Sequence, residues 1–191
     1  MRVLVPYGLR TQEKNKNFAV RKGPQHTSVL CADAGRARDC GIHSRCPDWG
    51  VGQSPTLVDT NVILDFFLSR EPENKNATML FEQIYQEKIE GLATASSITD
   101  IYYIMAKRLS ADQTREAIYD LLNILEIIPV DGYDCSKALD LPIPDFEDAL
   151  IVSCAKKADV QYIISHDKDF LRTDTDLVPV ITAADFLNSY Y

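Results

Sequence analysis

Two aspartates stand where a buried strand is expected to end. Asp59 follows the short apolar run Thr56-Leu-Val58, and Asp167 follows Ile163-Ile-Ser-His166. In open α/β sheets, functional sites form outside the carboxyl ends of the strands. These two carboxylates are therefore candidates for a common site.

Two further aspartates lie in expected helices among apolar neighbours. Asp100 stands in Ser97-Ile-Thr-Asp-Ile-Tyr-Tyr-Ile104, and Asp148 shares a helix stripe with residues 151, 152 and 155. A carboxylate on an apolar stripe is costly unless something pairs with it. Apart from Lys168 beside Asp167, no Lys or Arg stands at contact spacing from the four acids. The natural partner is a divalent cation, and all-oxygen ligands select Mg²⁺ or Mn²⁺ over zinc.

Each acid also has a simpler interpretation, and these interpretations stay open at the level of sequence. Asp59-Thr-Asn61 fits a helix cap, Asp148 fits the third helical position after a capping Asp145, and Asp167-Lys-Asp169 fits a surface turn. Asp100 is the hardest to explain in this way, because it lies in mid-helix. The strength of the hypothesis rests on all four converging at one edge of the sheet.

The elements that would position these acids alternate between strand and helix. This order predicts a mostly parallel sheet covered on both faces, an α/β fold with three α/β/α layers. Gly91 is expected to end the second helix, and Ser96 or Ser97 to cap the third. The expected strands are 56–58, 92–94, 124–130, 162–164 and 178–181, and the expected helices are 61–68, 77–89, 96–109, 111–122, 145–157 and 183–187.

Four segments together resemble the acidic motifs of PIN-domain nucleases, and most closely those of the bacterial branch of VapC-like toxins. They are Leu57-Val-Asp-Thr-Asn-Val-Ile-Leu-Asp65, Ser96-Ser-Ile-Thr-Asp-Ile-Tyr-Tyr103, Asp145-Phe-Glu-Asp-Ala-Leu150 and Ile163-Ile-Ser-His-Asp-Lys-Asp-Phe170. The resemblance implies a Mg²⁺- or Mn²⁺-dependent ribonuclease and an antitoxin protein as partner. It assigns catalysis and metal binding to Asp59, Asp100, Asp148 and Asp167. Asn61 would support the first acid, and Asp169 competes with Asp167 for the fourth position.

The first 55 residues differ from the rest in composition. They carry 9 Lys or Arg against 4 Asp or Glu, whereas residues 56–191 carry 11 against 24. We expect a nuclease-like domain over 56–191 and, over 1–55, a flexible basic tail or an extension outside the working protein. A zinc site from Cys31, Cys40, His43 and Cys46 is the alternative for this segment, weakened by the lack of a second cysteine pair.

The strongly acidic domain predicts weak nonspecific binding to RNA, because affinity for phosphate depends on Lys and Arg. Recognition would then be local, at Lys107-Arg108 and Lys156-Lys157, and a structured RNA would be cut in preference to bulk RNA. His166 is expected to line the rim of the site or to contact substrate. Four tyrosines are expected mainly in the core, with a homodimer or antitoxin face as the alternative: Tyr85, Tyr102, Tyr103 and Tyr119.

Two other functions compete with the nuclease. Transfer through an aspartyl phosphate also places acids at strand ends, but a phosphatase of that kind would have an acid at the position of Asn61. A non-catalytic binding module would use the acids only for structure. The odd number of cysteines favours a reducing, cytoplasmic setting, and no apolar run approaches the length of a membrane span.

Overall fold

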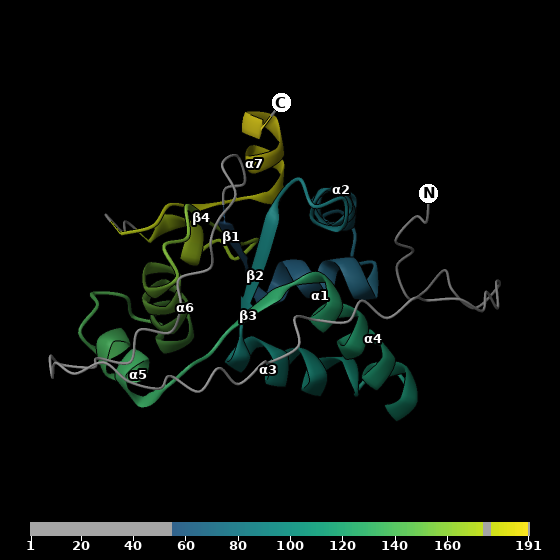
Figure 1. Cartoon of the computed structure of the whole chain (residues 1–191), viewed down its shortest axis with the longest axis horizontal. Helices are drawn as coiled ribbons and strands as arrows, with labels where there is room; N and C mark the ends of the chain where they lie inside the picture. Colours follow the sequence, from purple (N-terminus) through teal and green to yellow (C-terminus); the bar gives the residue numbers. More distant parts are fainter. Residues whose placement is uncertain (1–54, 174–176, 191) are drawn as a thin grey trace, which may run out of the picture.

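The computed structural model describes residues 55–173 and 177–190, which form three layers around a five-stranded parallel sheet (Figure 1). The strand order is β3-β2-β1-β4-β5, and every neighbouring pair is parallel. This confirms the predicted α/β class and its layers. The strands are β1 (Pro55–Val58), β2 (Glu90–Thr94), β3 (Glu126–Ile128), β4 (Tyr162–Ile164) and β5 (Val180–Ile181).

Helices cover both faces of the sheet. α1, α2, α3, α4 and α7 pack on one face, where they meet Val58, Ala93 and Ile164, and α5 and α6 pack on the other, against the alternate strand residues. Both faces are buried because successive side chains of a strand point to opposite sides. The helices are α1 (Thr60–Leu68), α2 (Asn74–Tyr85), α3 (Ala95–Met105), α4 (Ala111–Ile124), α5 (Gly132–Leu139), α6 (Phe146–Lys157) and α7 (Ala183–Tyr190), with a 3₁₀ turn, η2 (Phe170–Arg172).

The predicted role of Gly91 as a helix stop is wrong. α2 already ends at Tyr85, the chain turns at Glu87 with a φ of 59°, and Gly91 lies inside β2. A Cβ at Gly91 would stand 2.6 Å from Leu125 Cδ2 and 2.8 Å from Ile84 Cδ1. A larger residue at Gly91 would therefore require the Leu125 and Ile84 side chains to shift, so the glycine reflects close packing against the strand and not the end of a helix.

The stretch after α4 also differs from the prediction. The buried strand expected over 124–130 is reduced to β3, whose first residue, Glu126, is exposed. The short helix α5 was not predicted. It begins at a capping box in which Asp131 accepts hydrogen bonds from the backbone N–H of Tyr133 and Asp134, and Asp134 accepts one from Asp131.

The predicted boundary of the domain differs from the structure by one residue. Pro55, assigned above to the basic segment, is the first residue of β1. The other expectations for that segment, including the zinc alternative, lie outside the described residues. Within the ranges 55–173 and 177–190, no helix is long and apolar enough to cross a membrane.

Candidate active site

The site forms where β1 and β4 end side by side. β1 pairs with β2 on one side and with β4 on the other. The direction in which successive strands are added to the sheet therefore reverses between β1 and β4. Such a switch point leaves a crevice at the carboxyl ends of the strands. Asp59 follows β1, and Asp167 lies close after β4, so the fold places both acids at this crevice.

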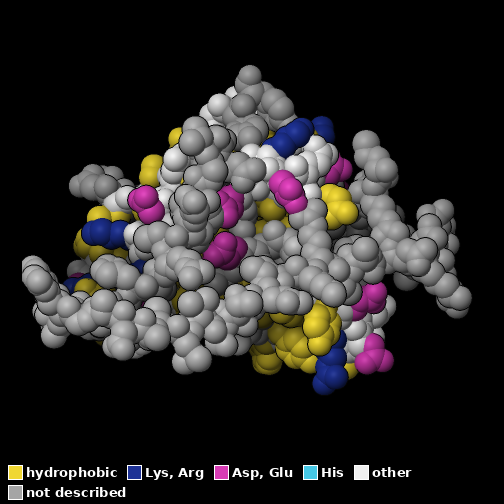
Figure 2. Space-filling view, viewed as in Figure 1, with side chains coloured by type: hydrophobic (Ala, Val, Ile, Leu, Met, Phe, Trp, Pro, Cys, Tyr) yellow, Lys and Arg dark blue, Asp and Glu magenta, His cyan; other side chains and the backbone are white. Residues whose placement is uncertain are grey.

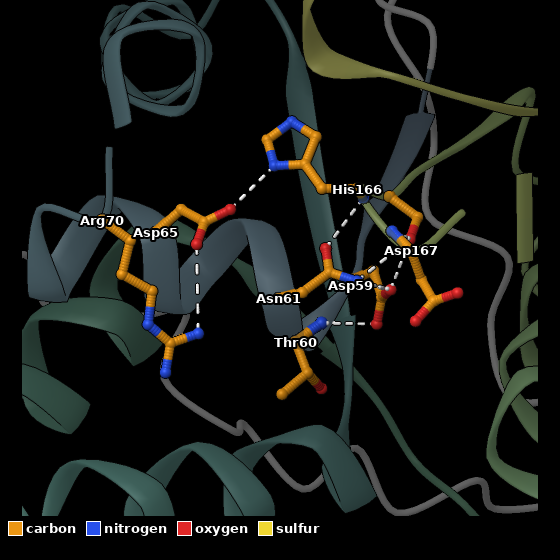
Figure 3. Close-up of polar contacts among 8 residues, drawn as sticks. Asp59, Thr60, Asn61, Asp65, Arg70, His166 and Asp167 are labelled. Atoms are coloured by element: carbon orange, nitrogen blue, oxygen red, sulfur yellow. Dashed lines mark hydrogen bonds and ion pairs between the residues drawn. The ribbon is translucent and has the colours of Figure 1, made fainter. Parts of the chain in front are cut away.

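Asp59 is held rigidly by its neighbours (Figure 3). It is 5% exposed and caps α1, with one carboxylate oxygen accepting a hydrogen bond from the Thr60 N–H at 2.6 Å. The other oxygen accepts from Asn61 Nδ2 and from Ser165 Oγ, both at 2.7 Å. The capping interpretation is therefore confirmed for Asp59. Capping is not its only position of interest, because Asp59 also lines a cavity.

The crevice opens into a cavity of about 980 Å³. All four predicted acids line this cavity, although they lie far apart in the sequence. Asn61 and Asp169 line it as well, whereas His166 is not among the described lining residues. The described lining residues are Asp59, Thr60, Asn61, Leu64, Arg70, Asp100, Tyr103, Ile104, Ile143, Pro144, Asp145, Glu147, Asp148, Asp167, Asp169 and Thr173.

The acids differ in how firmly they are held. Asp148 is half-buried in the first turn of α6, whose cap, Asp145, accepts hydrogen bonds from the N–H of Glu147 and Asp148. Asp167 is exposed, and its Oδ1 accepts from the N–H of Asp169 at 2.8 Å. The predicted cap at Asp145 and the turn after β4 are both confirmed.

The apolar-stripe argument for Asp100 is wrong. Asp100 is exposed, and so are Thr99, Tyr102 and Tyr103. The helix stripe that buries Ile101 and Met105 faces the core, while Asp100 lies on the side that faces the cavity. The aromatic residues around it gave the segment an apolar appearance although they are solvent-accessible.

Negative charge is crowded in the cavity. Burial, reinforced by the charge of Asp167, raises the pKa of Asp59 above its usual value. Burial and the charges of Asp145, Asp59, Asp167 and Glu147 raise the pKa of Asp148 to about 7. The pKa of Glu147 is also raised, first by burial and then by Asp100. These carboxylates interact electrostatically, so a bound cation would relieve their repulsion.

The donor set fits a hard divalent ion, because every acidic ligand in the cavity offers oxygen. The side chains do not form a ready coordination shell: in the part of the chain that the structure describes, no three His, Cys, Asp or Glu are grouped so that they could hold a metal ion. A cation would favour the charged form of these carboxylates and screen their mutual repulsion.

The His166 ring points toward Asp65 and away from Asp59 and Asp167 (Figure 3). Its Nδ1 lies 2.7 Å from Asp65 Oδ2, and its backbone N–H donates to Asn61 Oδ1 at 2.9 Å. Arg70 Nη1 lies 3.9 Å from the other Asp65 oxygen. His166 is therefore not placed at the rim, because its side chain joins the loop after β4 to α1; contact with substrate stays a prediction.

Several residues of the site were not predicted from the sequence. Ser165 is outside the described cavity lining but donates a hydrogen bond to Asp59, and its position directly after an apolar strand was a usable signal. Glu147 precedes Asp148 in the first turn of α6 and lines the cavity. Its position next to a predicted site acid was also a usable signal. Arg70 and Tyr103 gave no local signal, because only the packing of α1 against α3 brings them to the cavity.

The surface residues predicted to bind RNA or to fill the core also need correction. Lys157 donates to the carbonyl of Pro129 and pairs with the buried Asp134, so it has a structural role. Tyr85 packs against the core, but Tyr102, Tyr103 and Tyr119 are exposed at 38%, 64% and 70%. Figure 2 shows hydrophobic side chains gathered over the region of α3 and α4.

A family model described as PIN domain matches residues 55–169, which is more than half of the chain. The chain belongs to the PIN-domain family. The predicted resemblance is therefore confirmed, and the match spans all four acidic motifs, from Asp59 to Asp167.

This PIN domain is also similar to a curated protein, Ribonuclease VapC1 of Aquifex aeolicus (strain VF5). The two are 32% identical over 135 residues, which are 68% of this chain and 91% of the relative. The similarity thus extends over nearly the whole of that protein.

Solved structures of similar fold come from toxin–antitoxin systems. VapBC2 of Rickettsia felis bound to a promoter DNA fragment matches with a TM-score of 0.52 at 14% identity, covering 67% of this chain and 98% of that one. FitAcB of Neisseria gonorrhoeae matches with a TM-score of 0.52 at 18% identity, covering 68% and 98%. VapC20 of Mycobacterium tuberculosis, described as a toxin that cleaves the sarcin-ricin loop, matches with a TM-score of 0.51 at 15% identity, covering 60% and 92%. At these identities the likeness concerns the fold of this PIN domain.

Proposed function

We propose that this PIN domain is a divalent-metal-dependent endoribonuclease and the toxin of a toxin–antitoxin pair. The observation that carries the proposal is the convergence of the four motif acids on one cavity at the ends of β1 and β4. The relative named Ribonuclease VapC1, at 32% identity, supports RNA as the substrate. The aspartyl-phosphate alternative loses its support, because the family assigned to the chain accounts for all four acids.

Asp59, Asp100, Asp148 and Asp167 would bind the metal, Mg²⁺ or Mn²⁺. Asn61 and Ser165 support Asp59 through hydrogen bonds that fix its carboxylate plane. Asp169 remains the alternative to Asp167; its N–H binds the Asp167 carboxylate, and its own side chain pairs with Arg172 at 3.4 Å. This favours Asp167 as the fourth acid, since the Asp169 carboxylate already has a cationic neighbour.

When bound, the cation would lower the pKa of a water molecule and neutralise charge developing on the scissile phosphate. The residues of the chain position the reactants. Asp59 is the fixed ligand, whereas Asp100 and Asp167 have room to adjust. Asp145 caps α6 and so holds its first turn, which carries Asp148, in place.

The test is cleavage of RNA with Mg²⁺ or Mn²⁺, with and without EDTA, together with Mn²⁺ binding by calorimetry. We expect Asp59→Asn and Asp148→Asn each to reduce the cleavage rate by roughly 100-fold or more and to weaken Mn²⁺ binding. The matched control is Asp112→Asn, an exposed acid in the first turn of α4 that is not among the described lining residues. Full cleavage in EDTA would contradict the proposal, and Mn²⁺ binding without cleavage would favour the non-catalytic module.

The partners belong to the same proposal. The solved structures of VapBC2 and of a toxin–antitoxin complex from Klebsiella pneumoniae each contain a chain with a fold similar to this one. This supports an antitoxin protein as partner. We also propose a homodimer, supported by the exposed Tyr102, Tyr119 and Leu122 on α3 and α4; light scattering of the purified chain tests it. Cys135 and Cys154 are free thiols, in keeping with a cytoplasmic location.

A further inference from the structure

We propose that the cavity contains a nucleotide-binding subsite, in which Arg70, after α1, binds a phosphate of the RNA and Tyr103, on α3, stacks on an unpaired base. The inference rests on the proposed nuclease function and names the form of RNA that it takes. Arg70 lies outside the four acidic motifs, and Tyr103, the last residue of the second motif, is not one of the motif acids; neither residue has a role in the proposed metal chemistry.

Arg70 is the one Lys or Arg among the described residues that line the cavity. The same lining carries seven carboxylates, so a phosphodiester entering the cavity meets strong repulsion wherever a metal ion does not screen it. The seven are Asp59, Asp100, Asp145, Glu147, Asp148, Asp167 and Asp169. A guanidinium offers five N–H donors in a planar fork that matches two phosphate oxygens. Arg70 is therefore the group best suited to hold a phosphate next to the cleavage site.

Arg70 is held by an ion pair with Asp65 that leaves the N–H donors of its guanidinium available. Asp65, which is buried, lies 3.9 Å from Arg70 Nη1, and its other oxygen is held by His166 at 2.7 Å (Figure 3). At 3.9 Å this contact is an ion pair and not a hydrogen bond. The Arg70 side chain keeps 32% of its surface exposed. It is thus oriented by charge while its N–H groups remain available to a ligand.

Tyr103 is the one aromatic residue among the described lining residues, and it is 64% exposed. Lys107 Nζ lies over one face of the Tyr103 ring, 3.9 Å from its centre, so a base would stack on the opposite face. Exposed rings beside Lys or Arg are typical of surfaces that bind single-stranded nucleic acid, because a base stacks on the ring and the phosphate meets the charge. A paired base has no free face to offer, so the subsite selects nucleotides in loops, bulges or ends.

The test measures KM and kcat for cleavage of a short unpaired RNA by the full chain, and binding of the same RNA to the Asp59→Asn protein in Mg²⁺. We expect Arg70→Ala to raise both KM and the dissociation constant roughly 10- to 100-fold, since a charge-assisted hydrogen bond is lost. Tyr103→Ala should raise them about 5- to 100-fold. Tyr103→Phe should stay near the parent, and Arg70→Lys should restore only part of the loss.

Modified RNA identifies the contacts. If Arg70 binds one phosphate, a neutral methylphosphonate at that position removes the penalty of Arg70→Ala, and the salt dependence of binding falls by about 0.7 in slope. If Tyr103 stacks on one base, an abasic nucleotide there removes the penalty of Tyr103→Ala. Arg115→Ala on α4 and Tyr133→Ala on α5, exposed positions outside the described lining, are the matched controls, and thermal melts of each variant report folding.

The outcomes separate this inference from the proposed function. RNA cleavage that is unchanged within twofold by Arg70→Ala and Tyr103→Ala would overturn the subsite and leave the nuclease intact. RNA binding that depends on both residues in a chain that does not cleave RNA would support the subsite and overturn the nuclease. A penalty that is the same for unpaired, abasic and duplex RNA would also overturn the subsite, because it would reflect a general loss of structure or charge.

Discussion

Loss of the Lys157 ammonium should destabilise the whole domain, because it leaves a buried charge without its partner. Lys157, at the end of α6, donates to Pro129 O and pairs with Asp134, whose side chain is 2% exposed. Removing one partner of a fully buried ion pair costs about 3–5 kcal/mol. The Lys157 side chain is 36% exposed, and water reaches the pair from that side. We therefore expect Lys157→Met to lower the free energy of unfolding by about 2–3 kcal/mol.

Thermal denaturation followed by circular dichroism measures this loss. For a domain of this size, 1 kcal/mol corresponds to about 3–5 °C, so the melting temperature should fall by roughly 6–15 °C. Lys156→Met, an exposed neighbour on the same helix, is the matched control and should change it by no more than about 2 °C. Removing the stranded charge as well, in Lys157→Met with Asp134→Asn, should recover part of the loss. The reasoning fails if Lys157→Met and Lys156→Met melt together.

The remaining predictions concern packing and the support of the site. Gly91→Ala should cost about 1–3 kcal/mol in a denaturant titration, because its Cβ meets Leu125 and Ile84 below 3 Å. Gly132→Ala, whose Cβ would meet nothing within 4 Å, should be neutral or stabilise by up to about 1 kcal/mol. Ser165→Ala removes one hydrogen bond from Asp59; the affinity for Mn²⁺, measured by calorimetry, should fall roughly 10-fold, and an unchanged affinity would refute the supporting role of Ser165.

The order of elements was predictable because it depends on local signals. Alternating apolar runs and capped helices predicted the parallel sheet and placed Asp59 and Asp167 at strand ends. α5 was missed because it is short and its first turn is polar, although the pair Asp131 and Asp134 is a capping signature. Gly91 was misassigned because a glycine required by close packing looks the same in sequence as one that ends a helix.

The candidate site was predictable in its acids and not in its surroundings. Asp59 and Asp167 could be found because each follows a strand, and Asp148 because it shares a helix stripe with buried residues. Asp100 was selected on a burial argument that its exposed side chain contradicts. Arg70 lies in a polar loop, where a cation needs no explanation, and Tyr103 looks like a core residue. Their place beside the acids depends on how α1 and α3 pack, which is tertiary information that no short window of sequence contains.

At the end of the sheet opposite the cavity, the charged form of Glu90 is also disfavoured. This residue begins β2, and burial, reinforced by the charge of Glu126, raises its pKa to about 7. Between the ordinary value of about 4.5 and 7, the unfolded chain loses the proton of Glu90 while the folded chain keeps it. The unfolded state binds fewer protons over this range, so stability falls as pH rises from about 4.5 to about 7 and is level on either side.

Glu90→Gln removes this dependence, and the full shift would be worth about 3 kcal/mol. Because Glu90 is partly exposed, we expect a gain of about 1–2 kcal/mol at pH 8 and none at pH 4, measured by denaturant unfolding at both pH values. Glu126→Gln is the informative companion, since it removes the neighbouring charge and leaves the burial. Burial is the larger cause, so Glu126→Gln should give the smaller gain. An equal gain from Glu90→Gln at pH 4 and pH 8 would show that its effect comes from packing, because a protonated carboxyl at pH 4 carries no charge to remove.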